Sequence, residues 1–157
     1  MKPLPSPPEA DLLLENQLCF KLYAASRLVI RGYRPLLERL GLTYPQYLAM
    51  LVLWEWQARP PEQPTVKALG ERLMLDSGTL TPLLKRLEQL GHVQRRRAAQ
   101  DEREVHLALT PSGLALRDET AALRAQLICD SGLDLDEMVE LRARLSELLE
   151  RFSGLAG

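Results

Sequence analysis

The spacing of apolar residues changes between residues 65 and 110, and this change limits the fold more than any other feature of the sequence. Two short helical segments come first, "TVKALGERL" (Thr65–Leu73) and a second segment that ends at Gly91. Two extended segments follow, "HVQRRR" and "REVHLALT", and the second alternates apolar and polar residues. Helix, tight turn, helix and hairpin in this order predict a winged helix-turn-helix.

Three helical segments are expected before this unit. Apolar residues three and four apart predict an amphipathic helix from Asp11 to about Ile30. A short segment over 35–40 follows and ends at Gly41. Thr43 and Gln46 then match a capping box at the start of another helix. Its run "YLAMLVLWEW" is apolar on nearly all sides, which predicts a buried position.

Two further helices are expected after the hairpin. The first runs from Thr110, a predicted cap before Pro111, to about Asp130. The last ends at Phe152, and its apolar residues recur 3.5 positions apart on average, which is typical of a helix that packs along another helix. The predicted fold class is mainly α with a small β-hairpin wing (α+β), a winged helix-turn-helix with six helices.

The composition excludes several classes of protein. Of the 157 residues, 46% are hydrophobic and 26% are charged, as in soluble globular chains, and the apolar runs are too short for a membrane span. The Pro-rich segment 1–10 lacks the apolar stretch of a signal peptide, and we expect a disordered tail there. Two cysteines, Cys19 and Cys129, are too few for a disulfide framework, and a cytoplasmic location is expected. The net charge of −1 leaves room for a local basic patch.

A basic patch is expected on the second helix of the helix-turn-helix and on the strand after it. Between residues 85 and 97 five residues are Lys or Arg and one is acidic. Such a run is usually only a solvated face, but here it lies where a winged helix would meet phosphates of DNA. The helix also begins with small polar residues that can reach phosphates and base edges. Arg103 at the wing tip, with Asp101 nearby, fits a minor groove, so these positions together indicate DNA binding.

The stretch "LDSGTLTPLLKRLEQLGHVQRRRAAQDEREVHLALTPSG" resembles the winged-helix core of the MarR family, and more narrowly the organic hydroperoxide resistance regulators. The resemblance implies an interlocked helical homodimer that reads a pseudo-palindromic operator in double-stranded DNA. Residues 11–157 would form a single MarR-type domain, with dimerisation helices over 11–42 and 112–152 and the winged-helix DNA-binding part over 43–111. The implied DNA contacts are Ser77, Gly78, Thr79, Thr81, Lys85, Arg86, Asp101 and Arg103.

The same resemblance implies that Cys19 senses organic hydroperoxides, with Tyr23, Tyr33 and Tyr44 in the sensor pocket. A sulfur that attacks a peroxide needs thiolate character, and no cation lies three or four positions from Cys19. We also expect Cys19 to lie too far inside its helix for the helix dipole to act strongly on it. Phenolic O–H groups are therefore the expected stabilisers of the charged sulfur. Without the tyrosines, Cys19 would be interpreted as a small buried hydrophobic residue.

Cys129 matches a second cysteine that part of this subfamily carries, so the resemblance implies the two-cysteine type. Cys19 would be oxidised to a sulfenic acid and would condense with Cys129 of the other subunit. The disulfide would then release the operator of a peroxidase gene. In the alternative interpretation Cys129 is incidental, and a small thiol reacts with the oxidised Cys19.

Other kinds of chemistry have little support in the sequence. His92 and His106 lie 14 positions apart without cysteine neighbours, so no metal site is expected. No phosphate-binding glycine loop and no nucleophile–base arrangement is visible, and we expect neither a cofactor nor an enzyme. Three alternatives stay open: a MarR-type repressor released by a non-covalent phenolic or drug-like ligand, a thiol peroxidase, and a dimerising scaffold without DNA binding.

Overall fold

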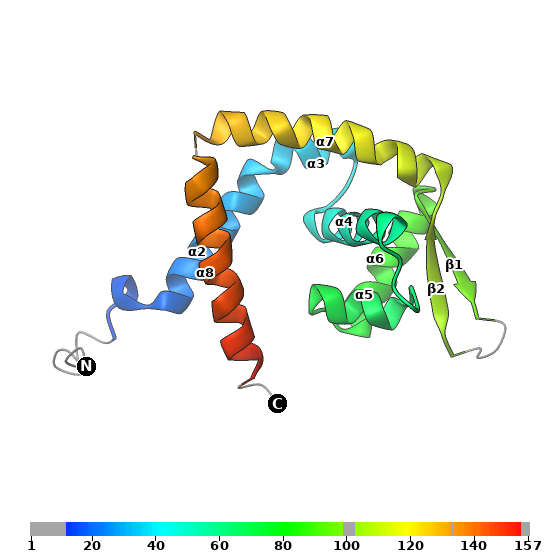
Figure 1. Cartoon of the computed structure of the whole chain (residues 1–157), viewed down its shortest axis with the longest axis horizontal. Coiled ribbons are helices and arrows are strands. Elements are labelled where there is room, and N and C mark those ends of the chain that lie inside the picture. Colours follow the sequence, from blue (N-terminus) through cyan, green and yellow to red (C-terminus); the bar gives the residue numbers. More distant parts are fainter. Residues whose placement is uncertain (1–11, 99–102, 133, 155–157) are drawn as a thin grey trace. The chain divides into compact units, whose positions relative to one another are not determined.

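The computed structural model in Figure 1 describes residues 12–98, 103–132 and 134–154. These ranges contain seven α-helices, one short 3-10 helix and a two-stranded antiparallel sheet. The elements are η1 (Leu14–Asn16), α2 (Leu18–Gly32), α3 (Arg34–Leu40), α4 (Tyr44–Ala58), α5 (Val66–Leu73), α6 (Ser77–Gln89), β1 (Val93–Arg97), β2 (Val105–Leu109), α7 (Pro111–Ser131) and α8 (Leu135–Ser153). The mainly helical fold with a hairpin wing is confirmed.

The structure has seven α-helices where six were counted, and the short segment expected over 35–40 is a helix of its own, α3. Pro35 lies in the first turn of α3. Proline has no backbone N–H and therefore cannot continue the hydrogen-bond ladder of the preceding helix. Tyr33 joins the two helices, and its carbonyl oxygen accepts the Leu37 N–H at 2.9 Å as α3 begins.

The start of the first long helix also differs from the prediction. A helix from Asp11 was expected, but α2 begins at Leu18, and Asp11 lies outside the described residues. Gln17 has extended backbone angles (φ −82°, ψ 114°), which separate η1 from α2. The Gln17 side-chain amide donates to the Leu13 carbonyl oxygen at 3.1 Å, and this hydrogen bond spans the short 3-10 helix η1. Cys19 is consequently the second residue of its helix.

The core of the winged-helix part is built around α4. The predicted capping box at its start is confirmed: the Thr43 N–H donates to Gln46 Oε1 at 2.9 Å, and the Gln46 N–H donates to Thr43 Oγ1 at 3.4 Å. The predicted buried position of the helix is also confirmed, since seven of its residues are buried. The buried residues are Gln46, Tyr47, Ala49, Met50, Val52, Leu53 and Trp54.

A close joint connects α4, the start of α7 and the segment that enters the wing. The buried Trp54 Nε1–H donates to the Gly113 carbonyl oxygen at 2.8 Å. Thr110 caps α7 through the Gly113 N–H (3.0 Å), and the Thr110 hydroxyl also donates to the Gly91 carbonyl oxygen at 2.5 Å. A Cβ atom on Gly113 would lie 2.1 Å from the His92 carbonyl oxygen, so only glycine fits there.

The wing itself is a short antiparallel hairpin. Val93 of β1 pairs with Leu109 of β2, and Arg97 pairs with Val105. The loop before α5 adds to its edge, since the Leu107 N–H donates to the Pro64 carbonyl oxygen at 2.8 Å. The tip between the strands, including Asp101, lies outside the described residues.

The chain divides into two compact units at residues 120 and 121, and the second contains the end of α7 and all of α8. α8 has no buried residue in the single chain. None of the helices in the described ranges is long and apolar enough to cross a membrane. The tail predicted over 1–10 lies outside these ranges.

We expect Gly113→Ala to lower the melting temperature by about 5 °C or more, because the new methyl group would overlap the His92 carbonyl oxygen and overpacking costs about 1–3 kcal/mol. Thermal unfolding followed by circular dichroism measures the effect. Gly154→Ala is the matched control, because its Cβ atom would meet nothing nearer than 3.6 Å. Equal melting temperatures for the two variants would contradict the close approach at Gly113.

Candidate DNA interface and cysteine site

The first turn of α6 is shaped by Asp76, which caps the helix. The Thr79 N–H donates to Asp76 Oδ1 at 2.8 Å, and the Thr79 hydroxyl donates to Asp76 Oδ2 at 3.2 Å. These hydrogen bonds, the one from the Thr79 N–H above all, hold the pKa of Asp76 below its ordinary value. The Thr79 hydroxyl proton is therefore directed to the cap, and phosphate oxygens, which only accept hydrogen bonds, would have to compete for it.

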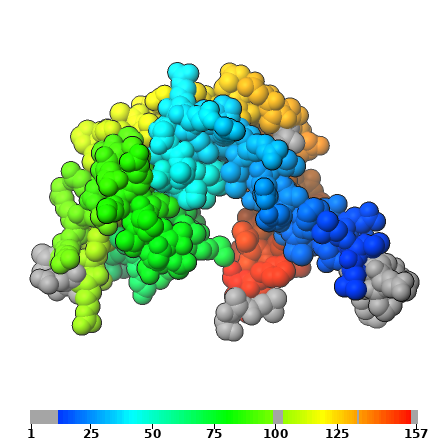
Figure 2. Space-filling view, turned by 180° about the vertical axis from the view of Figure 1, so that it is seen from behind, coloured from blue at the N-terminus to red at the C-terminus, as the bar shows by residue number. Residues whose placement is uncertain are grey.

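The exposed side of α6 carries four more of the residues expected to contact DNA. Ser77, Gly78, Thr81 and Lys85 are all exposed to solvent. The Thr81 hydroxyl donates to the Ser77 carbonyl oxygen at 2.8 Å, which leaves its methyl group and oxygen lone pairs for other contacts. In the space-filling view of Figure 2, α6 appears in bright green at the surface of the molecule.

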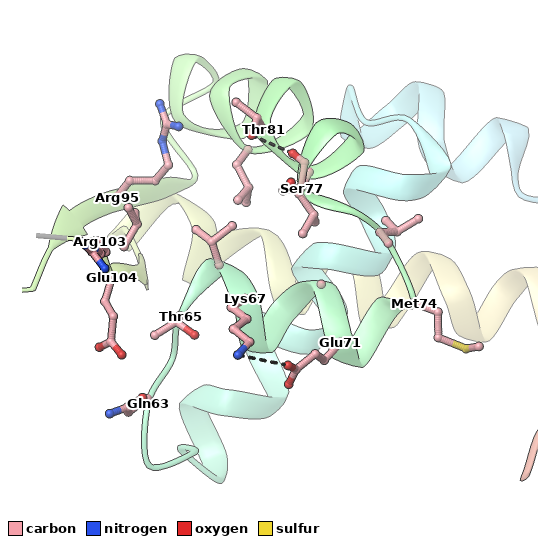
Figure 3. A pocket seen from close by; sticks show the side chains of 16 residues that line it. Gln63, Thr65, Lys67, Glu71, Met74, Ser77, Thr81, Arg95, Arg103 and Glu104 are labelled. Carbon is pink, nitrogen blue, oxygen red and sulfur yellow. Dashed lines mark hydrogen bonds and ion pairs between the residues drawn. The ribbon is translucent and has the colours of Figure 1, made fainter. Parts of the chain in front are cut away.

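A groove of about 760 Å³ runs between α5, α6 and the wing (Figure 3). Ser77 and Thr81 line it from α6, and Lys67 and Glu71 line it from α5. Arg103 lines it from the turn just before β2. The structure thus brings one wing residue and two residues of α6 to a common surface, as a winged helix that holds DNA requires.

Two basic residues of the expected patch have other settings: Arg95 also lines this groove but is held by an ion pair, and Arg86 lies elsewhere. Arg95 forms an ion pair with Glu88 at 2.7 Å, and its backbone N–H also donates to Glu88, so β1 is pinned to α6. Hydrogen bonds from Arg95 hold the pKa of Glu88 below its ordinary value. Arg86 lines a second groove with Arg31 and Tyr44, away from the groove between α5, α6 and the wing.

Cys19 lies in the first turn of α2 and is exposed. The expectation that it sits too deep in its helix to feel the dipole is corrected, because the helix begins one residue earlier than Cys19. The N–H groups of a first helical turn lack intrahelical partners, and this end of the helix favours negative charge. The interpretation of Cys19 as a buried residue does not hold in the single chain.

The three predicted pocket tyrosines fall into two places. Tyr23 is one turn after Cys19, and its hydroxyl oxygen accepts a hydrogen bond from Arg27 at 2.7 Å. Tyr33 and Tyr44 lie together, with ring centroids 5.6 Å apart. They are at the other end of α2, about 20 Å from Cys19 at 1.5 Å per helical residue.

Sequence reasoning missed two residues of this region. The buried ring of Tyr47 lies 5.6 Å from Tyr33 and 6.0 Å from Tyr44, which makes the pair a cluster of three. The sequence feature that could have identified Tyr47 is its spacing of three positions from Tyr44, which puts both residues on one face of α4. Arg27, whose guanidinium lies 5.4 Å from the centre of the Tyr23 ring, was detectable by its spacing of four positions from Tyr23.

Cys129 is exposed near the end of α7 and belongs to the second compact unit. Both cysteines carry free thiols. Within the described ranges no group of three or more His, Cys, Asp or Glu side chains is arranged to hold a metal ion.

Comparison with known proteins identifies the family. A family model for the transcriptional regulators SarA/Rot matches residues 31–120. The organic hydroperoxide resistance transcriptional regulator of Bacillus subtilis is 47% identical over 137 residues, which are 87% of this chain and 90% of that protein. The chain belongs to the MarR/SarA family of winged-helix transcriptional regulators.

Solved structures of family members agree with this assignment. Reduced AbfR bound to DNA is 38% identical to this MarR/SarA regulator, with a TM-score of 0.74, and the match covers 92% of this chain and 95% of that one. A disulfide-formed structure of AbfR is 36% identical, with a TM-score of 0.60 and 94% of each chain covered. AbfR is a protein of Staphylococcus epidermidis.

We expect Glu88→Gln to lower the melting temperature by about 1–3 °C at pH 7, because a half-exposed ion pair is worth less than about 1 kcal/mol. The folded pKa of Glu88 lies below its ordinary value of 4.5, so the pair stabilises above pH 4.5 and its contribution is lost as the pH falls through the folded pKa. Melting curves at pH 7 and pH 3 measure this difference.

Glu71→Gln is the control for this prediction. The Glu71 carboxylate is exposed and lies 4.0 Å from Lys67 Nζ, so little change is expected at either pH. A Glu88→Gln effect of the same size at both pH values would mean that the Arg95 pair is not its cause.

Proposed function

We propose that this MarR/SarA regulator is a homodimeric repressor that senses organic hydroperoxides through Cys19 and releases operator DNA of a peroxidase gene when oxidised. The observation that carries the proposal is the exposed thiol of Cys19 in the first turn of α2. The similarity to an organic hydroperoxide resistance regulator supports the choice of inducer. The AbfR structures in reduced and disulfide forms support a redox mechanism.

The dimer is proposed from the apolar faces that the single chain leaves in water. α2 and α8 contain no buried residue, yet both expose large apolar side chains. A helix that leaves many large apolar side chains exposed is a candidate interaction site, and a second copy of the chain offers the matching faces. The exposed apolar residues are Leu18, Leu22, Leu28 and Val29 on α2, and Leu135, Val139, Leu141, Leu149 and Phe152 on α8.

The sensor pocket follows from the position of the tyrosines. Tyr33 and Tyr44 lie about 20 Å from Cys19 of the same chain, too far for a hydrogen bond. If they donate to the Cys19 sulfur, they must therefore belong to the other copy, whose α2 would run antiparallel to this one. Cys19 then has two sources of stabilisation for negative charge, the start of its own helix and phenolic O–H groups. The exposed Leu18 and Leu22 suit an organic hydroperoxide.

The proposed chemistry has two steps. The Cys19 thiolate attacks one oxygen of the hydroperoxide, the O–O bond breaks, and the leaving alkoxide takes a proton and departs as an alcohol, which leaves a sulfenic acid. The Cys129 thiol of the other copy then attacks the sulfenic sulfur, and water leaves as the disulfide forms. The peroxide is thereby reduced by two electrons and the two thiols are oxidised.

The disulfide would act on DNA binding through the dimer helices. α2 and the end of α7 carry the two cysteines, and the start of α7 is joined to α4 at Gly113 and to the end of α6 through Thr110 and Gly91. The oxidised and reduced states must differ in operator affinity for release to occur, and a changed spacing of the two α6 helices supplies that difference.

We expect Cys19→Ser to bind operator DNA within about two-fold of the wild type but not to be released by cumene hydroperoxide, because serine cannot be oxidised in this way. A mobility-shift assay on the chain's own upstream region, with and without the peroxide, measures both properties. Release of the Cys19→Ser variant by peroxide would overturn the sensor assignment. Release by a phenolic ligand alone would favour a non-covalent inducer, and sustained peroxide turnover with a thiol reductant would favour a peroxidase.

We expect Cys129→Ala to lose the interchain band that peroxide produces on a non-reducing gel, because the resolving thiol is absent. A mixture of re-associated Cys19→Ser and Cys129→Ala chains provides the stricter test. A mixed dimer retains one Cys19 and one Cys129 on opposite subunits, so an interchain link should restore the band. A band from Cys129→Ala alone would argue against a resolving role, and no band from the mixture would argue for a link within one subunit.

A further inference from the structure

Met74 occupies the turn between α5 and α6 in a backbone conformation that is unfavourable for residues with a Cβ atom. Its φ of 56° and ψ of 39° lie in the left-handed region. Among the described residues it is the only residue other than glycine with a positive φ. The position after a helix in this conformation is usually glycine, because a Cβ atom is disfavoured there. A methionine at position 74 therefore lowers the stability of the folded chain.

The packing of α5 against α6 enforces this turn without help from the Met74 side chain. A Cβ atom on Gly70 would lie 2.8 Å from Leu80 Cδ1 and 2.9 Å from the Leu75 carbonyl oxygen, which shows how closely the two helices approach. The Met74 N–H donates to the Glu71 carbonyl oxygen at 3.3 Å, and the Leu75 N–H donates to that of Gly70 at 2.9 Å. Both hydrogen bonds join backbone groups, and a glycine at position 74 would make them equally well.

The Met74 side chain is 71% exposed and lies at the mouth of the candidate DNA interface. It lines the same groove as Ser77 and Thr81 of α6. Figure 3 shows it at the end of α5, on the connection that leads to α6. In the free protein the exposed Met74 side chain is not removed from water and therefore contributes no hydrophobic stabilisation. Such stabilisation would have to come from contact with a bound partner.

We propose that Met74 contacts operator DNA, with its side chain packed on an apolar group of the DNA beside the start of α6. The 5-methyl group of a thymine in the major groove and the face of a deoxyribose have the required chemistry. Methionine is long, unbranched and flexible, which suits a contact reached from a turn. The inference rests on operator binding by α6, which belongs to the proposed function.

An apolar contact differs from a phosphate contact in its response to salt. Each phosphate contact adds to the slope of log affinity against log salt concentration, whereas an apolar contact leaves that slope unchanged. Met74→Gln keeps the length of the side chain and removes its apolar character. We expect it to weaken binding to a DNA fragment from the chain's own upstream region about ten-fold at every salt concentration. Met74→Leu should restore most of the affinity.

Lys85→Ala serves as the contrasting variant, because loss of a phosphate contact should lower the salt slope by about one. If Met74→Gln binds within two-fold of the wild type, or changes the salt slope as Lys85→Ala does, the inference is wrong. If the wild type itself fails to bind the fragment, the proposed function fails instead.

Met74→Gly separates the DNA contact from folding. It should raise the melting temperature by a few degrees, since glycine adopts the left-handed conformation freely, and should lower operator affinity as Met74→Gln does. Unchanged or increased affinity of this better-folded variant would overturn the inference. Replacing thymines one at a time by uracil then identifies the group contacted. A position at which the replacement weakens the wild type but not Met74→Gln indicates a methyl contact, and a response that is equal at all positions indicates a sugar contact.

Discussion

The hydrogen bond from the Trp54 indole to the Gly113 carbonyl oxygen is the interaction on which the arrangement of the winged helix depends. It is buried and joins two segments 59 positions apart, so its loss would leave a polar group without a partner in the core. Position 113 has to be glycine for the segments to approach this closely, because the His92 carbonyl oxygen lies where a Cβ atom would be. Through this joint, α4, the entry to the wing and the start of α7 hold one another in place.

The joint gives the DNA-binding surface a defined geometry. Thr110 ties the start of α7 to the end of α6 through Gly91, and Glu88 pins β1 to α6 through Arg95. Two polar side chains of α6 already hold hydrogen bonds within the fold. The Thr79 and Thr81 hydroxyls donate within the helix or to its cap, whereas Ser77, Lys85 and the wing residue Arg103 remain on the exposed surface.

The redox proposal depends on a different kind of constraint, the length of a helix. Cys19 is the second residue of α2 and Tyr33 follows its end, so the two cannot meet within one chain. The apolar residues that α2 and α8 leave exposed support a second copy as the source of the missing contacts. We therefore propose that peroxide sensing and dimer formation use the same surface.

The sequence by itself determined the elements of this protein and their order. The Thr43–Gln46 capping box, the Thr110 cap and the change to alternating apolar residues in β2 are local patterns, and local backbone chemistry decides them. The sequence predicted helix boundaries less accurately. The interruption at Gln17 comes from the hydrogen bond of its side chain to the Leu13 carbonyl oxygen, not from a proline or glycine that breaks the helix. That single difference moved Cys19 from the interior of a helix to its start.

Only the tertiary structure decided which polar groups are already occupied. The partners of Arg95 and Trp54 lie seven and 59 positions away, and a sequence pattern does not distinguish a polar group held by such a partner from one left for a ligand. The left-handed turn at Met74 is of the same kind, since it results from the close packing of Gly70 against Leu80 rather than from a glycine in the turn itself. Contacts between distant residues set these features, and they exist only once the chain has folded.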